Sequence, residues 1–127
     1  MQPYFLSAAI LAVVIGLVHS ILGERLIFNR LRDGSQLVPT KGKPLLRERH
    51  IRILWATWHI VTIFGWGIAA MLFSFAWPAS QTTPEVIVTY AIGASMLASS
   101  LLVLYATKGK HPGWIGLLIV ALLCWLA

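Results

Sequence analysis

The chain has 127 residues, of which 58% are hydrophobic, and a mean hydropathy of +0.80. This length fits one domain, covering residues 1–127, and this hydropathy excludes an ordinary soluble domain of that size. The net charge of +6 does not indicate nucleic-acid binding, because the basic residues flank apolar segments and Lys41-Gly42-Lys43-Pro44 lacks the upstream Gly and the Ser or Thr of a phosphate-binding loop. Composition therefore predicts an integral membrane protein with no nucleic-acid partner.

Four apolar segments follow one another, at about residues 4–22, 53–77, 86–106 and 114–127. A membrane-spanning helix needs about 20 mainly apolar residues, which the first three segments meet. The fourth is at the short end of that range, and neighbouring helices or a locally thinner bilayer would have to support it. We therefore predict an all-α fold, a bundle of four transmembrane helices.

The first segment does not end cleanly, because an amphipathic continuation leads on to about Arg32 before the turn pair Asp33-Gly34. Pro44 favours the start of the second helix, whose first turns are also amphipathic. Glu48 and Arg52 are four residues apart there, in the favourable order for an ion pair on one helix face. Both helices are thus expected to extend beyond the membrane on the same side.

The later connections contain standard helix boundaries. Pro78 stops the second helix, and Thr83-Pro84-Glu85 is typical of a helix start, with a capping residue, a proline at the first position and an acid near the positive helix end. Gly109 is expected to end the third helix. The third and fourth helices should therefore form a close antiparallel pair.

All ten Lys and Arg residues lie in two of the three connections: eight in residues 25–52, two at 108–110 and none in 78–85. Because Lys and Arg resist translocation, both basic connections are expected in the cytoplasm and both termini outside, in the cytoplasmic (inner) membrane of a bacterium. Basic residues beside a membrane also attract anionic lipid headgroups. The residues expected at the headgroups are Arg30, Arg32, Lys41, Lys43, Arg47, Arg49, Arg52, Lys108 and Lys110.

Histidines are the titratable groups at depth. At a rise of 1.5 Å per residue, His19 and His59 each lie about 9 Å to the cytoplasmic side of the middle of their helices. His111 begins the fourth helix on the same side, and Glu24 lies slightly shallower than His19. Ionisable residues within spans are costly and tend to face the interior of a bundle. These four residues are therefore expected to converge in the cytoplasmic half.

Helical spacing predicts which faces meet. Small residues line one stripe of the first helix, which also contains His19 and Ser20, and such stripes allow close helix packing. His59 and Thr62 are three residues apart and should reach the same partner, while Glu24 is expected either to orient His19 or to pair with an arginine of the next helix. Each histidine taken alone also fits a structural hydrogen bond. The candidate pathway residues are His19, His59, His111, Glu24, Thr62, Ser99 and Tyr105.

Three functions are compatible with this pattern. The first is an oligomeric permeation protein for ions, protons or small solutes that uses the histidine cluster, because four spans of this size are too few to enclose a wide pathway. The second is a redox or metal-binding protein in which His19 and His59 ligate haem b or a transition metal. The third is an accessory subunit of a larger membrane complex. An enzymatic role is disfavoured, because Cys124 is the single cysteine and Asp33, the single aspartate, lies in a turn.

Overall fold

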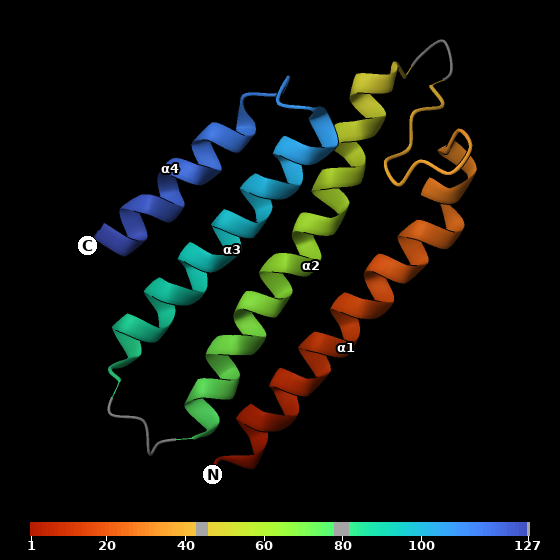
Figure 1. Cartoon of the computed structure of the whole chain (residues 1–127). Helices are drawn as coiled ribbons and strands as arrows, with labels where there is room; N and C mark the ends of the chain where they lie inside the picture. Colours follow the sequence, from red (N-terminus) through yellow and green to blue (C-terminus); the bar gives the residue numbers. More distant parts are fainter. Residues whose placement is uncertain (43–45, 78–81, 127) are drawn as a thin grey trace.

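The computed structural model describes residues 1–42, 46–77 and 82–126 and places four α-helices in this part of the chain. They are α1 (Pro3–Leu26), α2 (Glu48–Ala76), α3 (Pro84–Thr107) and α4 (Gly113–Leu126), with one 3-10 turn, η1 (Phe28–Leu31), after α1 (Figure 1). The all-α prediction is confirmed. Lys43, Pro44 and Pro78, which the sequence analysis used, lie outside the described residues.

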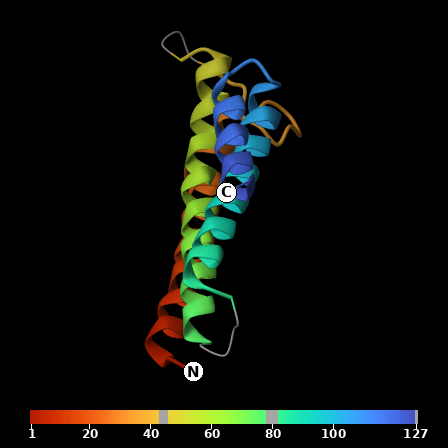
Figure 2. The same ribbon diagram turned by 90° about the vertical axis from the view of Figure 1, so that its left-hand side faces the viewer.

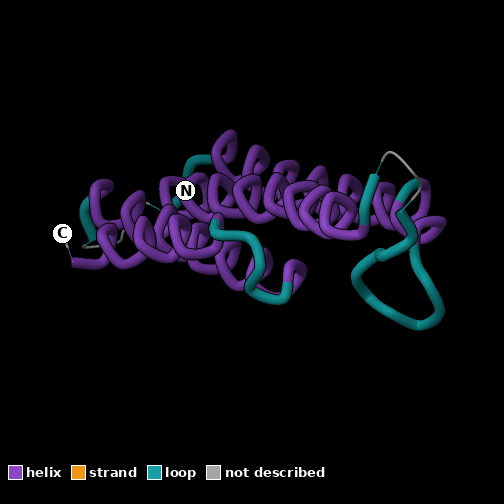
Figure 3. Tube along the Cα trace, turned by 90° about the horizontal axis from the view of Figure 1, so that it is seen from above, coloured by secondary structure: helices purple, strands orange, loops and turns teal. Residues whose placement is uncertain are grey.

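The helices form a row in chain order. Among the described residues the packed pairs are α1 with α2, α2 with α3, and α3 with α4 (Figure 1). The molecule is narrow when turned by 90°, with the amino terminus at one end and the carboxyl terminus about midway along its length (Figure 2). Seen from above, the longest loop is a wide excursion at one end of the row (Figure 3). We call the end where α1 ends, α2 begins and α3 turns into α4 the basic end.

Three helical segments are long and apolar enough to cross a membrane: Pro3–Leu31, Glu48–Ala76 and Pro84–Thr107. This indicates an integral membrane protein. The shorter apolar helix α4 has 14 residues, so it extends over about 21 Å, less than the roughly 30 Å of a bilayer's hydrocarbon core. The α1 side chains Ile10, Leu11 and Ile15 are exposed, as lipid-facing residues are.

The boundaries of α3 follow the predicted signals closely. Thr83 is the extended residue before the helix, and Pro84 occupies its first position. The reversal after α3 takes two left-handed residues, Lys108 with φ 53° and Gly109 with φ 73°, and the helix ends at Thr107, as the predicted glycine cap requires. The amide of Gly109 donates to the carbonyl of Leu104 at 2.9 Å, which closes the turn.

The first connection differs from the prediction. The α-helix ends at Leu26 instead of continuing to about Arg32, and the 3-10 turn follows. The physical reason is burial: Phe28 is only 3% exposed and packs in a core cluster with Trp55 of α2 and Val103 of α3. The loop then folds back, because the amides of Thr40 and Lys41 both donate to the carbonyl of Leu31, at 3.0 and 2.8 Å.

Small residues set the spacing between helices. The buried residues of α1 are Ala9, Gly16 and Gly23, which confirms the predicted packing stripe. Small side chains recur where α2 and α3 are buried, including Ala56 and Ser99, both 0% exposed. Close approach of backbones through such residues is the usual way that helices pack within a membrane.

Candidate functional site

Two tryptophans of α2 lie on two glycines of α1. The indole of Trp66 covers Gly16 and that of Trp58 covers Gly23, so closely that a Cβ on either glycine would lie 2.6 or 2.1 Å from an indole nitrogen. The indole N–H groups donate to α1 carbonyls, from Trp66 to Val13 at 3.3 Å and from Trp58 to His19 at 3.1 Å. These contacts fix how α1 is rotated against α2, and so which polar side chains meet.

The Glu24 carboxylate receives three donors at the basic end of this interface. Its Oε1 accepts from Trp55 Nε1 at 2.5 Å and from His59 Nε2 at 2.9 Å. Its Oε2 accepts from Arg32, which η1 brings back over the end of α1. Since the side chains of Glu24, His59 and Arg32 are 26%, 16% and 17% exposed, this is a largely desolvated charged cluster.

The second ring nitrogen of His59, Nδ1, extends these contacts further into the membrane span. His59 Nδ1 lies 2.9 Å from Ser20 Oγ, and Ser20 Oγ lies 2.8 Å from Thr62 Oγ1. Thr62 in turn donates to the carbonyl of Gly16 at 3.1 Å. His59 and Thr62 therefore share a partner, as the spacing predicted, and that partner is Ser20. We call Glu24, His59, Ser20 and Thr62 with the Gly16 carbonyl the polar chain.

Counting hydrogens shows what the polar chain can do. Its four contacts, from Glu24 to the Gly16 carbonyl, need four hydrogens. The Ser20 and Thr62 hydroxyls supply two and the Nε2–H that faces the carboxylate supplies a third. The fourth must be on Nδ1, so all four contacts are hydrogen bonds only when His59 is an imidazolium beside the Glu24 carboxylate. When the His59 ring is neutral, one of the four contacts lacks a hydrogen. The Ser20 hydroxyl then donates either to His59 Nδ1 or to Thr62 Oγ1.

The structure brings three of the seven candidate pathway residues together, namely Glu24, His59 and Thr62. His19 instead stacks on Trp58, with ring centroids 4.4 Å apart and an interplanar angle of 8°, and its Nε2 lies 3.3 Å from the Trp58 carbonyl. Glu24 thus contacts His59 and not His19, and its arginine partner comes from its own side of the loop, not from the next helix.

The other three candidates lie elsewhere in the row. His111 is exposed at the α3–α4 turn, where its Nδ1 accepts from the amide of Gly113 at 3.1 Å. Ser99 is fully buried, and its hydroxyl has no hydrogen-bond partner among the described residues. Tyr105 is 59% exposed. The expected convergence of three histidines therefore reduces to one histidine with a carboxylate.

The arrangement does not fit a haem or metal held by His19 and His59. Both ring nitrogens of His59 already face protein groups, and the His19 ring is stacked with its Nε2 toward a carbonyl. In the part of the chain that the structure describes, no group of three or more His, Cys, Asp and Glu is placed to hold a metal ion. His19 and His59 are therefore not placed to ligate a shared haem or metal ion.

Ser20 and Trp55 were not predicted as site residues. A signal for both was present, because Ser20 and Glu24 are four residues apart on the first helix and Trp55 and His59 are four apart on the second. Residues four apart share a face of a helix. Two such pairs at matching depth would have pointed to one four-residue contact.

Four of the residues expected at lipid headgroups have partners in their own chain, including exposed Lys41 with Asp33 at 3.8 Å and exposed Arg49, which donates to His50 at 3.3 Å. Arg32 pairs with Glu24, and Arg52, only 8% exposed, donates to Glu48 at 2.7 Å and to the carbonyl of Ala106 at 3.0 Å. The predicted pair of Glu48 and Arg52 is thereby confirmed. The other described members of the set are exposed at the basic end: Arg30, Arg47, Lys108 and Lys110.

No protein-family model matches this chain, and no curated protein or solved structure matches it either. Its function must therefore be argued from the geometry of the polar chain and of the basic end.

Proposed function

We propose that the protein is an oligomeric proton permeation protein of a bacterial cytoplasmic membrane. Its basic end faces the cytoplasm and its amino terminus lies outside, with α4 entering from the cytoplasmic side and its carboxyl end directed outward. The positive-inside rule supports this orientation, since the nine Lys and Arg residues that the structure describes all lie at the basic end. The observation that supports the activity is the polar chain between α1 and α2.

Within the polar chain His59 can gain and release a proton, and the Ser20 and Thr62 hydroxyls can reorient their hydrogens. A proton that arrives at His59 Nδ1 turns the Ser20 hydroxyl toward Thr62, and loss of that proton turns it back. Glu24 and Arg32 at the basic end provide the fixed charges beside which His59 changes state. Histidine is the side chain whose charge ordinarily changes near physiological pH, which makes it the central group of the proposal.

The proposal includes oligomerisation for a geometric reason. Between Glu24 and Gly16 the chain follows α1 for eight residues, or about 12 Å, which is less than half of the hydrocarbon thickness. The described helices pack extensively only on their neighbours in the row, so one copy does not enclose the remaining path. A second copy against the exposed apolar face of α1 would cover it.

Proton flux in liposomes tests the proposal directly. The protein is reconstituted with an internal pH-sensitive dye, and a potassium gradient with valinomycin drives proton entry. The informative variant is His59→Gln, because the amide keeps a donor for Glu24 and an acceptor for Ser20 but cannot take up a proton at neutral pH. We expect flux to fall about tenfold or more, since the titrating group of the chain is lost.

The matched control is His19→Gln, the same substitution at similar depth outside the polar chain, and its flux should stay within about twofold of the parent. Far-UV circular dichroism and gel filtration test whether both variants fold. Equal flux through His59→Gln and the parent would overturn the proposal. So would a parent protein that conducts no protons, which would favour the accessory-subunit hypothesis.

A further inference from the structure

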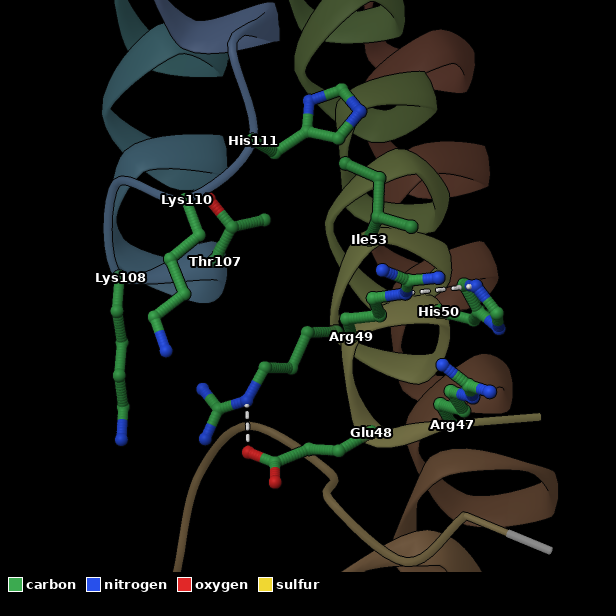
Figure 4. Close-up of a pocket in the computed structure, with 10 residues that line it drawn as sticks. Arg47, Glu48, Arg49, His50, Ile53, Thr107, Lys108, Lys110 and His111 are labelled. Atoms are coloured by element: carbon green, nitrogen blue, oxygen red, sulfur yellow. Dashed lines mark hydrogen bonds and ion pairs between the residues drawn. The ribbon is translucent and has the colours of Figure 1, made fainter. Parts of the chain in front are cut away.

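A second feature lies at the basic end, on the other side of α2. An open cavity of about 730 Å³ lies between the amino end of α2 and the α3–α4 connection. Figure 4 shows Lys108 and Lys110 reaching from the connection on one side, while Arg47 and Glu48 come from α2 on the other. This volume is within the range of small-ligand sites, roughly 300–1,000 Å³.

The lining is strongly and asymmetrically charged. Five of its ten residues are Arg or Lys and one is acidic. That acid, Glu48, is already engaged by Arg52 at 2.7 Å. The four remaining basic residues form no ion pair with any residue that the structure describes: Arg47, Arg49, Lys108 and Lys110. Four basic residues without an ion pair among the described residues thus border one cavity, although Lys108 and Lys110 also interact electrostatically with Glu48.

The backbone around the cavity adds positive potential at the start of α2, while the carbonyls at the end of α3 are hydrogen-bonded. The first turn of α2 has no side-chain cap, and its amides are at the positive end of a 29-residue helix. The last carbonyls of α3, which would repel an anion, are all occupied. Those of Leu104, Tyr105 and Thr107 accept from backbone amides of residues 108–110, and that of Ala106 accepts from Arg52.

We infer that this cavity binds an anion of phosphate type that bears two or more negative charges. Arg side chains on one wall offer paired donors for phosphate oxygens, and Lys side chains on the other wall add point charges. Basic pockets between helices at the cytoplasmic surface of a membrane are suited to lipids with anionic headgroups. The same chemistry would accept a soluble phosphate compound, so the experiment has to separate the two sources. The inference does not depend on proton flux.

Titration calorimetry on the purified protein in neutral maltoside detergent tests the inference with two probes. One probe is cardiolipin in detergent micelles, with phosphatidylcholine as the blank, and the other is inorganic pyrophosphate with no lipid added. The test variant is Arg49→Gln with Lys108→Gln, one exposed residue from each wall. The control is Arg25→Gln, which removes a charge from an exposed position outside the cavity and outside the set of residues expected at lipid headgroups.

We expect the cavity pair to lower the affinity about 25-fold, because each basic residue near an anionic group contributes roughly fivefold. The Arg25→Gln control should stay within about twofold. A loss confined to the cavity pair with cardiolipin identifies a lipid ligand, and the same loss with pyrophosphate identifies a soluble one. The inference is overturned if Arg25→Gln weakens binding as much as the cavity pair does, if neither variant weakens it, or if the parent protein binds neither probe.

Discussion

Replacing Gly23 by alanine tests whether the tryptophan on that glycine holds α1 and α2 in register. An alanine Cβ would lie 2.1 Å from Trp58 Nε1 and 2.6 Å from its Cε2, far inside van der Waals contact. The indole cannot simply rotate away, since it stacks on the ring of His19 and donates to the His19 carbonyl at 3.1 Å. The two helices must therefore separate or the indole must give up both contacts.

The size of the effect follows from three contributions. Overpacking typically costs about 1–3 kcal/mol, and the lost indole hydrogen bond about 1 kcal/mol more. Alanine regains about 1 kcal/mol over glycine within a helix. The free energy of unfolding should therefore fall by about 1–3 kcal/mol, taking these contributions together. The matched control is Gly65→Ala, where a Cβ meets no atom within 4 Å, so only the helix preference acts and stability should rise by up to about 1 kcal/mol.

Unfolding by dodecyl sulfate in mixed micelles, followed by far-UV circular dichroism, measures both variants. The same chemical change is thus expected to act in opposite directions at two helical glycines. Proton flux should also fall in Gly23→Ala, because displacement of α1 moves Ser20 away from His59. If Gly23→Ala were as stable as Gly65→Ala, the close contact of Trp58 with Gly23 would be refuted.

Two further pairs of variants probe the buried polar groups, with the same unfolding measurement. Glu24→Gln should lower the free energy of unfolding by about 1–3 kcal/mol, because three largely buried donors lose their charged acceptor. Exposed Glu85→Gln should lower it by less than about 1 kcal/mol. Equal losses would contradict the interpretation that Glu24 is the acceptor of a buried cluster. Ser100→Ala should cost about 1 kcal/mol, since its hydroxyl donates to the Trp114 carbonyl at 2.7 Å. Ser99→Ala should be neutral or slightly stabilising, because that buried hydroxyl has no partner among the described residues; a loss as large as that of Ser100→Ala would show otherwise.

The long helices could be predicted because the bilayer imposes a one-dimensional rule. Any span must be apolar for about 20 residues and must satisfy its backbone within one helix, and the amino-acid order alone reveals both properties. The packing stripe of α1, including Gly16 and Gly23, was visible for the same reason, since close approach requires small residues at helical spacing. The break after Leu26 was not visible, because it depends on the burial of Phe28 in a cluster that also contains Val103, which is 75 residues away in sequence.

The site was predicted in depth but not in rotation. His19 and His59 were expected at one level because depth accumulates at 1.5 Å per residue. Rotation accumulates at about 100° per residue, so an error of one position changes the partner. The residue of α1 that meets His59 is Ser20, the neighbour of His19. The packing of Trp66 and Trp58 on two glycines of α1 decides which of these two residues faces His59. This packing depends on both helices, so the pattern of one helix cannot predict it.

The distribution of polar contacts gives a further argument that the polar chain has a role beyond adhesion. Among the described residues, α3 and α4 are joined by apolar packing, with Trp125 against Gly93, and by the single hydrogen bond from Ser100 to the Trp114 carbonyl. Hydrogen bonds between helices in a membrane contribute only about 0.6 kcal/mol each on average, so packing does not require many of them. The α1–α2 interface, by contrast, places a carboxylate, an arginine and a histidine in a largely desolvated position and links them to two hydroxyls. Burying such charges is costly even when they are paired, which is why we interpret the polar chain as a functional element and not as a fastening.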